Sequence, residues 1–423
     1  MITGTSFARQ YEAAGTDDLR ILVVGAGIAG VTLAQLLRRQ GKHPVLIERS
    51  RDAETMADDE HAGYMLALMP MVDPVLDGLE VREDYRDRSV AIDRYTFHAH
   101  TGKTIRQDRL GGLLAQYGDY RGIARGELIT VLAGTSCPVS FDSSLDAIAD
   151  GEPASDTVPA RVQVATGVHG DAPEMHEAEF DLVVIADGLN SHTRALVPGG
   201  ESEGSVDTAW GGWVAWAPAD DDTDQVDELW GEGFFLGAYP VKDGIGVFLG
   251  GPDSREPLGA RRFAAEVRSK LTTLTPRIDT ALTAVAEADD PYFWALRDFR
   301  SSQWTTANTV LLGDAAAGFL PTAGIGAGMS MESARMLAAS LETTSSAQLP
   351  DALSRFEAVQ RPRVEQAQTN SRQLAGLMFY LPRALAGLRG MLFRLVSLRT
   401  ALGPIIDLLK HPAGPDEVRI PEA

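Results

Sequence analysis

The sequence predicts an α/β fold in which a parallel-sheet core, an inserted antiparallel sheet and C-terminal helices share one chain. Three observations carry this prediction: a β-branched run that enters a glycine-rich turn near the N-terminus, alternating aromatic and small residues in the middle, and apolar helical segments near the end. At 423 residues the chain also exceeds the size of one ordinary hydrophobic core. We therefore expect more than one domain.

Composition and charge are those of an ordinary globular protein and argue against several kinds of partner. Hydrophobic residues make up 44%, charged residues 23%, and the formal net charge is −21. This charge argues against nonspecific binding to nucleic acid. The one cysteine, Cys137, allows no intrachain disulfide and no cysteine-based metal site, and it is consistent with a cytoplasmic location. The first 18 residues lack the apolar core of a signal peptide.

The stretch ILVVGAGIAGVTLAQLL, residues 21–37, is apolar, uncharged and interrupted by glycines. It is too short and too broken for a membrane span, which needs about 20 apolar residues. Its β-branched front half predicts a buried strand, and residues 28–39 have the spacing of a helix. Gly25, Gly27 and Gly30 stand at the junction in the order G-x-G-x-x-G. This pattern is typical of dinucleotide-binding turns.

Each glycine has a separate physical task in such a turn. Gly25 permits the tight turn, Gly27 lets a pyrophosphate approach the backbone, and Gly30 lets helix and strand pack closely. The free N–H groups at the helix start, near Ile28 and Ala29, and the helix dipole favour an anion there. A strand–helix–strand unit with no ligand remains the alternative at this point.

A second predicted strand, HPVLIER (43–49), ends in an acid that strengthens the motif. Glu48 follows Gly30 by 18 positions, close to the spacing of about 20 expected for a carboxylate that binds a ribose. It can accept hydrogen bonds from the hydroxyls of an adenosine ribose. The pattern predicts a dinucleotide, but by itself it does not separate FAD from NAD.

A buried strand with a sharp turn recurs in FDLVVIADGLNSHTR, residues 180–194. Its apolar part predicts a strand, which Asp187 and Gly188 close. A polar turn that contains Ser191 and Arg194 follows. An Asp-Gly pair after a strand is common, so this segment alone indicates only a change of chain direction.

Residues 308–341 are more informative, because a short apolar strand there meets Gly313 and Asp314. A Pro- and Gly-rich loop follows, and a helix is expected to begin near Ala327. An uncharged glycine-rich loop that opens a helix presents backbone N–H groups to an anion. A buried Asp314 needs donors such as the hydroxyls of a sugar alcohol. These features suggest FAD, whose adenosine and flavin ends need separate sites.

In this order the motifs resemble those of group A FAD-dependent monooxygenases of the para-hydroxybenzoate hydroxylase type, over most of the chain. The resemblance implies a Rossmann-like FAD-binding domain of the GR2 type. The fingerprint ends in Glu48 and Arg49, and RGELITVL resembles a segment whose arginine, here Arg125, contacts FAD. Asp187 matches a motif tied to FAD and NAD(P)H, and Asp314 matches the aspartate that holds the ribityl chain. The implied cofactor contacts are Gly25, Gly27, Ile28, Ala29, Gly30, Glu48, Arg49, Arg125, Asp187, Gly188, Gly313, Asp314, Pro321, Gly324, Gly326, Ala327, Gly328 and Met329.

Two positions depart from the family pattern. Members often carry a histidine after Gly-Asp-Ala-Ala, where this chain has Ala317, and a glutamine in the glycine loop, where it has Ile325. These differences leave the FAD prediction intact. They argue against transferring details from members that match better.

The middle of the chain predicts an antiparallel sheet, because residues 208–218, 228–240 and 244–251 alternate aromatic residues with glycines between short turns. In the family such a sheet forms the wall of the substrate cavity. Alternation sends some of its aromatic residues to one face, where they would suit a planar hydrophobic substrate, and the others into the core. The candidates for the wall are Trp213, Trp216, Trp230, Phe235, Tyr239 and Phe248.

No general base stands out, although two residues are candidates. The loop DDEHAGYML, residues 58–66, lies in a region that runs past the flavin ring in the family, so that His61 or Tyr64 would approach the substrate. His98 and His100 resemble part of an exposed hairpin and lack a third ligand, so we expect no metal.

The expected organisation is a discontinuous FAD-binding domain, residues 1–199 and 301–345, with a substrate-binding sheet at 200–300 and a helical region at 346–423. Arginines interrupt the apolar stretch 371–409, which argues against a spanning helix. It is predicted either to pack on the FAD-binding domain or to contact a membrane surface or a partner. The chain is expected to be a monomer or a homodimer.

The resemblance implies that NADPH or NADH reduces FAD and that O2 is the co-substrate. A flavin C4a-hydroperoxide would then hydroxylate or epoxidise a hydrophobic, aromatic or polyketide-like small molecule, as in secondary metabolism. The alternatives are a reductase or dehydrogenase, a halogenase on the same fold, and a non-enzymatic flavin- or ligand-binding protein. A halogenase of this fold usually needs a lysine shortly after the first strand–helix–strand unit. No lysine occurs between Lys42 and Lys103, so the halogenase is disfavoured.

Overall fold

The computed structural model describes residues 1–57, 64–149, 159–197, 199–200, 204–289, 291–379 and 398–420. At its centre lies a four-stranded parallel sheet in the order β20-β13-β2-β3. The residues of these short strands are fully buried, as expected for aliphatic strands covered on both faces. The strands are β2 (Ile21–Val24), β3 (Val45–Ile47), β13 (Leu182–Ile185) and β20 (Thr309–Leu311).

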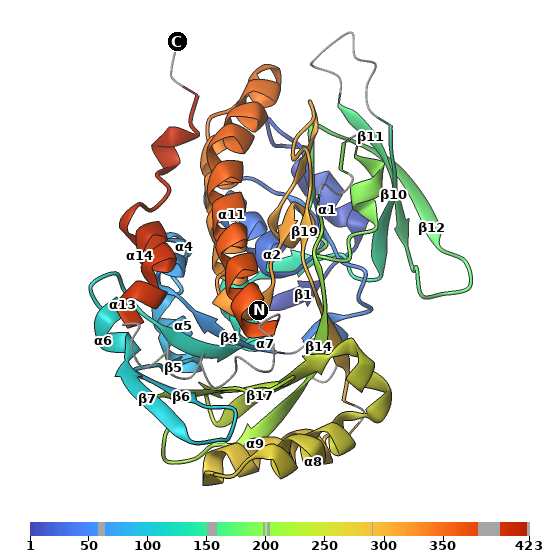
Figure 1. Cartoon of the computed structure of the whole chain (residues 1–423). Coiled ribbons are helices and arrows are strands. Elements are labelled where there is room, and N and C mark those ends of the chain that lie inside the picture. The colour runs from blue at the N-terminus through green and yellow to red at the C-terminus, as the bar shows by residue number, and fades with distance from the viewer. Residues whose placement is uncertain are drawn as a thin grey trace.

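Two helices pack side by side against this sheet. α2 (Ile28–Arg39) follows the glycine-rich turn with the bounds that the sequence predicts, and α10 (Gly326–Ser340) begins one residue before the predicted start. The long helix α11 (Leu349–Phe379) packs on α10 and runs through the upper part of the molecule in Figure 1. A buried Glu332 on α10 accepts from Gln360 and Arg363 of α11, at 3.1 and 2.7 Å, and fixes this contact.

A seven-stranded sheet forms the second main layer, in the order β18-β14-β17-β16-β15-β6-β7. The predicted aromatic stretches lie in it, although residues 228–240 form two strands rather than one. Residues 94–109 also join the sheet, because β6 pairs in parallel with β15. The sheet therefore extends beyond residues 200–300, and the division into domains stays a proposal. Its strands are β6 (Arg94–His98), β7 (Thr104–Arg109), β14 (Asp207–Pro218), β15 (Gln225–Trp230), β16 (Phe235–Val241), β17 (Gly244–Pro252) and β18 (Phe293–Arg297).

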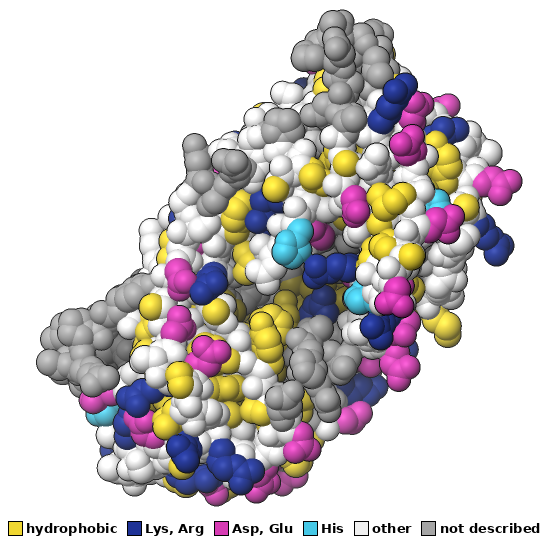
Figure 2. All heavy atoms as spheres, turned by 90° about the vertical axis from the view of Figure 1, so that its right-hand side faces the viewer, with side chains coloured by type: hydrophobic (Ala, Val, Ile, Leu, Met, Phe, Trp, Pro, Cys, Tyr) yellow, Lys and Arg dark blue, Asp and Glu magenta, His cyan; other side chains and the backbone are white. Residues whose placement is uncertain are grey.

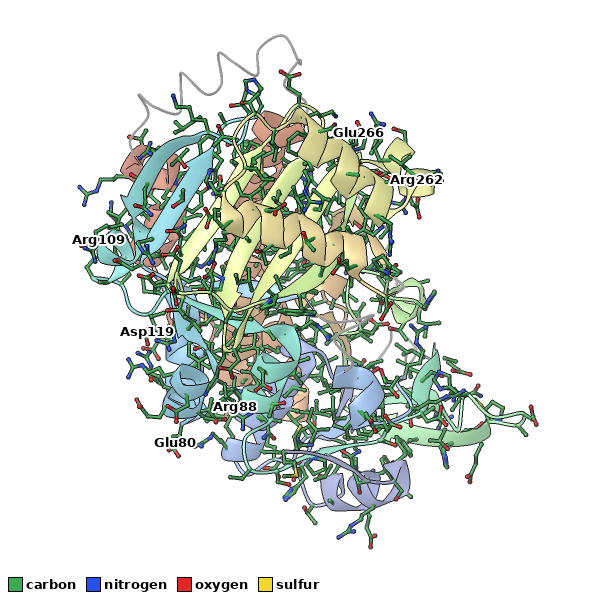
Figure 3. All side chains as sticks on the ribbon, turned by 90° about the horizontal axis from the view of Figure 1, so that it is seen from below. Glu80, Arg88, Arg109, Asp119, Arg262 and Glu266 are labelled. Carbon is green, nitrogen blue, oxygen red and sulfur yellow. The ribbon has the colours of Figure 1, made fainter. Side chains whose placement is uncertain are left out.

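Helices α8 (Ala260–Lys270) and α9 (Pro276–Glu287) cover the outer face of this sheet, at the bottom of Figure 1. Figure 3 looks onto these helices from below, with Arg262 and Glu266 of α8 labelled. α9 starts where Thr275 accepts a hydrogen bond from the Ile278 N–H, with a proline at the first helical position. The inner face is turned toward the layer that holds the parallel sheet.

Smaller elements complete the two layers. A hairpin after residue 160 belongs to an antiparallel sheet of β10 (Ser143–Ala149), β11 (Ala160–Thr166) and β12 (Glu174–Phe180). Between the two main layers lie the strands β4 (Met65–Leu68), β5 (Val90–Ala91) and β8 (Arg121–Ala124), and β8 leads into α7 (Arg125–Ala133). Other short helices and strands are β1 (Ile2–Gly4), α1 (Phe7–Ala14), α3 (Ala53–Ala57), α4 (Asp73–Gly78), α5 (Arg82–Arg88), α6 (Leu110–Leu114), β9 (Cys137–Val139), β19 (Phe299–Arg300) and β21 (Ala317–Gly318).

Near the C-terminus lie the short helices α13 (Leu398–Ala401) and α14 (Gly403–Lys410), followed by a 3-10 turn at Pro415–Glu417. Much of the predicted apolar stretch 371–409 falls at positions 380–397, outside the described residues. Its prediction as a contact for a membrane or a partner is therefore untested. None of the described helices combines the length and the apolar character that crossing a membrane requires.

We expect Phe263→Ala to lower the free energy of unfolding by about 3–5 kcal/mol, as large aromatic-to-alanine changes in cores do. Phe263 of α8 is fully buried against the sheet, with its ring centroid 5.5 Å from that of Trp213. Urea unfolding of both proteins measures the difference. The neighbouring exposed Arg262→Ala should change stability by less than about 0.5 kcal/mol. Equal effects would show that α8 is not anchored through this ring.

Candidate functional site

The carboxyl ends of β2, β13 and β20 meet at one edge of the parallel sheet, and a glycine or an aspartate follows each within two residues. Gly25 has φ +100°, and a Cβ there would lie 2.6 Å from the Ala186 carbonyl oxygen. Gly313 has φ +62°, and its Cβ would lie 2.8 Å from that of Ala29. Side chains at these points would push the strand ends and α2 apart. The glycines thus permit a close convergence of three backbone turns.

The other two glycines of the first motif have opposite surroundings. A Cβ on Gly30 would overlap the Gly25 carbonyl oxygen, so this position packs helix against turn. A Cβ on Gly27 would meet no heavy atom within 4 Å. The space is therefore open where α2 begins, and no side chain caps that helix start. This is the arrangement that a pyrophosphate needs in order to approach free backbone N–H groups, including those near Ile28 and Ala29.

Glu48 stands beside this turn at the end of β3. Its Oε2 accepts from the Ala26 N–H at 2.7 Å, and its Oε1 accepts from the N–H and hydroxyl of Ser50 at 2.9 and 3.1 Å. An ionised carboxylate has about four acceptor positions, so the group retains capacity for a ribose hydroxyl. The side chain of Arg49 is exposed next to it. Their predicted contacts with the adenosine half of FAD stay predictions.

The turn after β13 holds a buried acceptor that the protein leaves partly unsatisfied. Asp187 Oδ2 accepts from the Thr193 hydroxyl at 2.7 Å, whereas its buried Oδ1 has no partner in the described part of the chain. Gly188 has φ +86°, with open space around its Cβ position. A buried acceptor without a donor costs stability unless a ligand supplies one. This turn therefore fits a bound group that carries hydroxyls or N–H donors.

Arg194 joins the Asp-Gly and Gly-Asp turns, a role that sequence reasoning missed. Its Nε donates to the Ala315 carbonyl at 2.8 Å and its Nη2 to the Gly188 carbonyl at 3.1 Å. The guanidinium carbon lies 3.5 Å from the ring centroid of Phe299. Burial lowers the pKa of Arg194, which Asp187 and Asp314 counteract. The sequence signal was an arginine seven positions after Asp187.

A second polar group of the site consists of Asp314, Arg125 and Tyr64. Burial raises the pKa of Asp314 to about 6, although Arg125, a hydrogen bond with Ser330 and Arg194 oppose the shift. The backbone N–H of Arg125 donates to the Tyr64 carbonyl at 2.9 Å, and its side chain also hydrogen-bonds the phenol. The predicted residues Arg125 and Asp314 are thus brought together. Tyr64 joins them, and His61 lies outside the described residues.

The loop that precedes α10 contains the other predicted contacts. Pro321 opens a short 3-10 turn, Gly324 is left-handed with φ +62°, and Gly326 begins α10 without a side-chain cap. A Cβ on Gly328 would come within 2.7 Å of the Met71 sulfur, so a larger residue would have to displace the Met71 side chain. Ala327 and Met329 complete this first turn. Its uncapped N–H groups and the helix dipole favour negative charge.

Four of the six candidates for the substrate wall lie on the inner face of the seven-stranded sheet. Trp230 and Phe235 pack in one cluster with Leu320, which comes from the loop before α10, and Phe248 borders it. Tyr239 lies on the same face next to Glu228. This cluster brings the sheet and the glycine loop together.

Two candidates behave differently. The prediction for Trp213 is wrong, because alternation turns its ring to the outer face, against Phe263 of α8. The alternation of side chains along β14 places Trp216 on the inner face, but 36% of its surface is exposed. The prediction missed Trp294, which pairs with Gly212 and lies 5.7 Å from the Tyr64 ring. Nothing near Trp294 in the sequence marked it as part of the wall.

The residues fit FAD by the tests that the structure offers. Open space at Gly27, an unsatisfied acceptor at Asp187 and an uncapped helix start at Gly326 lie at the ends of converging elements. Figure 2 shows a hollow in the middle of one face of the molecule, with basic and hydrophobic side chains near its rim. Among the described residues no three His, Cys, Asp or Glu side chains gather as metal ligands. The fold and site define an FAD-dependent oxidoreductase.

The chain belongs to the FAD-binding-domain family, whose model matches residues 18–371. It is 29% identical over 388 residues to 3-amino-4-hydroxybenzoate 2-monooxygenase of Streptomyces cremeus, covering 86% of this chain and 89% of that protein. It is 26% identical to 3-hydroxybenzoate 6-hydroxylase 1 of Aquipseudomonas alcaligenes, covering 88% and 92%. The structure of Klebsiella pneumoniae HpxO with FAD and uric acid superposes with a TM-score of 0.77 at 19% identity, covering 93% and 97%. The predicted resemblance to FAD-dependent aromatic hydroxylases is confirmed.

We expect Gly27→Val and Gly30→Val to separate cofactor binding from folding. The valine of Gly27→Val would occupy the open space at the start of α2, so this variant should fold but be purified without FAD. The valine of Gly30→Val would collide with the Gly25 carbonyl, so both folding and FAD binding should suffer. Flavin absorbance and thermal unfolding of the two variants measure these effects. Full FAD content in Gly27→Val would contradict this placement of the pyrophosphate.

We expect Asp314→Asn to stabilise flavin-stripped protein at pH 7–8 while weakening FAD binding. The folded-state pKa of about 6 lies above the ordinary value of 3.8. As pH rises from about 4 to 6, the carboxyl ionises in the unfolded chain before it ionises in the folded protein, so the free energy of unfolding falls over this range. After allowance for solvent screening, the gain should be about 1–2 kcal/mol. Unfolding from pH 4 to 8 should show the two proteins converge near pH 4. A pH-independent difference would contradict this account.

Proposed function

We propose that the protein is an FAD-dependent monooxygenase that hydroxylates an aromatic small molecule, with NADPH or NADH as electron donor and O2 as co-substrate. The observation that carries this proposal is the aromatic inner face of the sheet, which meets the glycine loop through Leu320. The relatives named for activity on hydroxybenzoates support the aromatic substrate. Bound FAD supplies electron transfer from the nicotinamide and activation of O2.

The chain's own residues bind, orient and shield the reactants. Backbone N–H groups beside Gly27 would hold the pyrophosphate, and Asp314 would accept from the ribityl hydroxyls. The positive end of α10 would favour negative charge on the flavin pyrimidine ring. Trp230 and Phe235, which are nearly buried, would stack with the substrate and exclude water from the reacting atoms.

Several finer expectations remain proposals. These are the cytoplasmic location, a monomer or homodimer, and a membrane or partner contact by the C-terminal helices. Tyr64 stays a candidate for contact with the substrate, and its position beside Trp294 and Arg125 supports this. The division at residues 199/200 and 300/301 also stays a proposal, with the hairpin of residues 94–109 added to the substrate-binding sheet.

The test is to supply purified holoprotein with NADPH or NADH, 18O2 and a panel of phenols, quinolones and polyketide-like aromatics. The protein should be yellow, one ligand class should accelerate nicotinamide oxidation, and the product should carry one labelled oxygen. Stimulated oxidation without labelled product would favour a reductase. Protein that cannot be loaded with FAD would contradict the cofactor assignment.

A further inference from the structure

We propose that Glu228 determines the charge of the accepted substrate. It makes one end of the inner face of the seven-stranded sheet accept aromatic rings that carry neutral or cationic hydrogen-bond donors and reject rings that carry a carboxylate there. This inference rests on the proposed function, because it takes the inner face of the sheet as the substrate wall. Four features of the structure support it: the direction in which Glu228 points, its hydrogen-bond partners, the hydrogen-bonding capacity that these partners retain, and its exposure.

The register of β15 turns Glu228 inward. Its neighbour Leu229 packs in the cluster under α8 and α9, and its other neighbour Asp227 forms an ion pair with Arg277 of α9 at 2.9 Å. Because side chains alternate along a strand, Glu228 faces the opposite side. It pairs with Gly237, which has no side chain to cover it. A carboxylate thus stands on a face otherwise dominated by aromatic residues.

Three neutral donors hold this carboxylate. Its Oε2 accepts from the Tyr95 hydroxyl at 2.6 Å and from the Trp230 indole N–H at 2.9 Å, and its Oε1 accepts from the Tyr239 hydroxyl at 2.8 Å. Acceptance at both oxygens is the arrangement of an ionised carboxylate. The ion pairs of the described residues include none with Glu228. Its charge is therefore held by hydrogen bonds rather than neutralised by a cation.

These hydrogen bonds use the donors of the three side chains, so the groups that remain for a ligand here are acceptors. Tyr95 and Tyr239 each have one O–H, and Trp230 has one indole N–H, all of which are directed to Glu228. The remaining capacity is the lone pairs of two phenol oxygens and of the carboxylate. A ligand N–H or O–H finds partners here. A ligand carboxylate meets acceptors and a like charge.

An arginine of the same face, Arg106, does not reverse that conclusion. Arg106 of β7 stands opposite Phe97, two strands away from Glu228. It is paired with Asp108 of the same strand through contacts of 2.5 and 2.6 Å. The two opposite charges largely cancel at a distance. Glu228 therefore dominates the potential at its end of the wall.

The group is also accessible from within the molecule. Glu228, Tyr95 and Tyr239 are each partly rather than fully buried, although they lie between the sheet and the FAD-binding layer. The adjacent Trp230 belongs to the cluster that contains Leu320 of the glycine loop. The accessible surface of Glu228 thus opens toward the space between sheet and loop, where the proposed function places the substrate.

The test measures the binding of matched aromatic amides and carboxylates, such as 3-hydroxybenzamide and 3-hydroxybenzoate, with pairs of one to three rings. Binding to the FAD-loaded protein is followed by the flavin absorbance and by tryptophan fluorescence, to which Trp230 contributes. We expect the parent protein to prefer the amides by about tenfold or more, because a like charge lies close to the bound carboxylate. In Glu228→Gln this preference should fall several-fold.

Two further variants separate charge from structure. Glu232→Gln removes the same charge from a site outside the cavity, where the side chain is 45% exposed, and it should keep the parent's preference. Tyr239→Phe keeps the Glu228 charge but removes one hydrogen bond, so affinities should change while the preference for amides remains. If Glu228→Gln folds poorly, the comparison of amides with carboxylates on the parent protein keeps the proposal falsifiable.

The outcomes are distinct from those that test the proposed function. Carboxylates that bind as tightly as amides, a preference unchanged in Glu228→Gln, or a panel in which neither kind binds would each overturn the role of Glu228. None of these results depends on oxygen transfer. Conversely, a protein that shows the charge preference but yields no labelled product would contradict the monooxygenase and leave the binding role of Glu228 in place.

Discussion

The structure depends on the close approach of backbone turns at one edge of the parallel sheet. Gly25, Gly30 and Gly313 each occupy a point where a side chain would strike backbone or a neighbouring helix. Their contacts bring β2, β13, β20 and the starts of α2 and α10 to one edge. The groups that bind a dinucleotide are thereby brought together: free backbone N–H groups, two helix dipoles and carboxylates at the strand ends. A larger residue at any of the three would separate parts that must act together.

The polar groups at this edge are arranged for a ligand rather than for the stability of the protein alone. Asp187 keeps one buried oxygen without a partner among the described residues, and burial raises the pKa of Asp314 to about 6. Both features cost folding energy in the absence of a ligand. Arg194 limits the cost by binding carbonyls of both turns. The turns are thereby held in place before a cofactor binds, which reduces the entropy that binding must oppose.

The sequence predicted those parts of the fold that depend on local patterns. Residues 28–39 could be identified as a helix because the glycine-rich turn, the apolar spacing and a helix-ending glycine, Gly41, lie within 20 positions. The face on which Trp213 lies could not be predicted, because it depends on where α8 and α9 cover the sheet. Trp294 and the hairpin of residues 94–109 were missed for a related reason. Both enter the site through strand pairing between distant segments, which leaves no periodic signal near either partner.

Two adjacent acids show how the sheet separates stability from recognition. Asp227 points outward and is buried between Arg277 and His98, at 2.9 and 2.7 Å, where it anchors α9 to the sheet. Glu228 points inward and receives only neutral donors. A cation beside Glu228 would neutralise it and remove its influence on a ligand, whereas tyrosine and tryptophan satisfy its oxygens and preserve its charge. The alternation of one strand therefore places a structural ion pair on one face and a selective charge on the other.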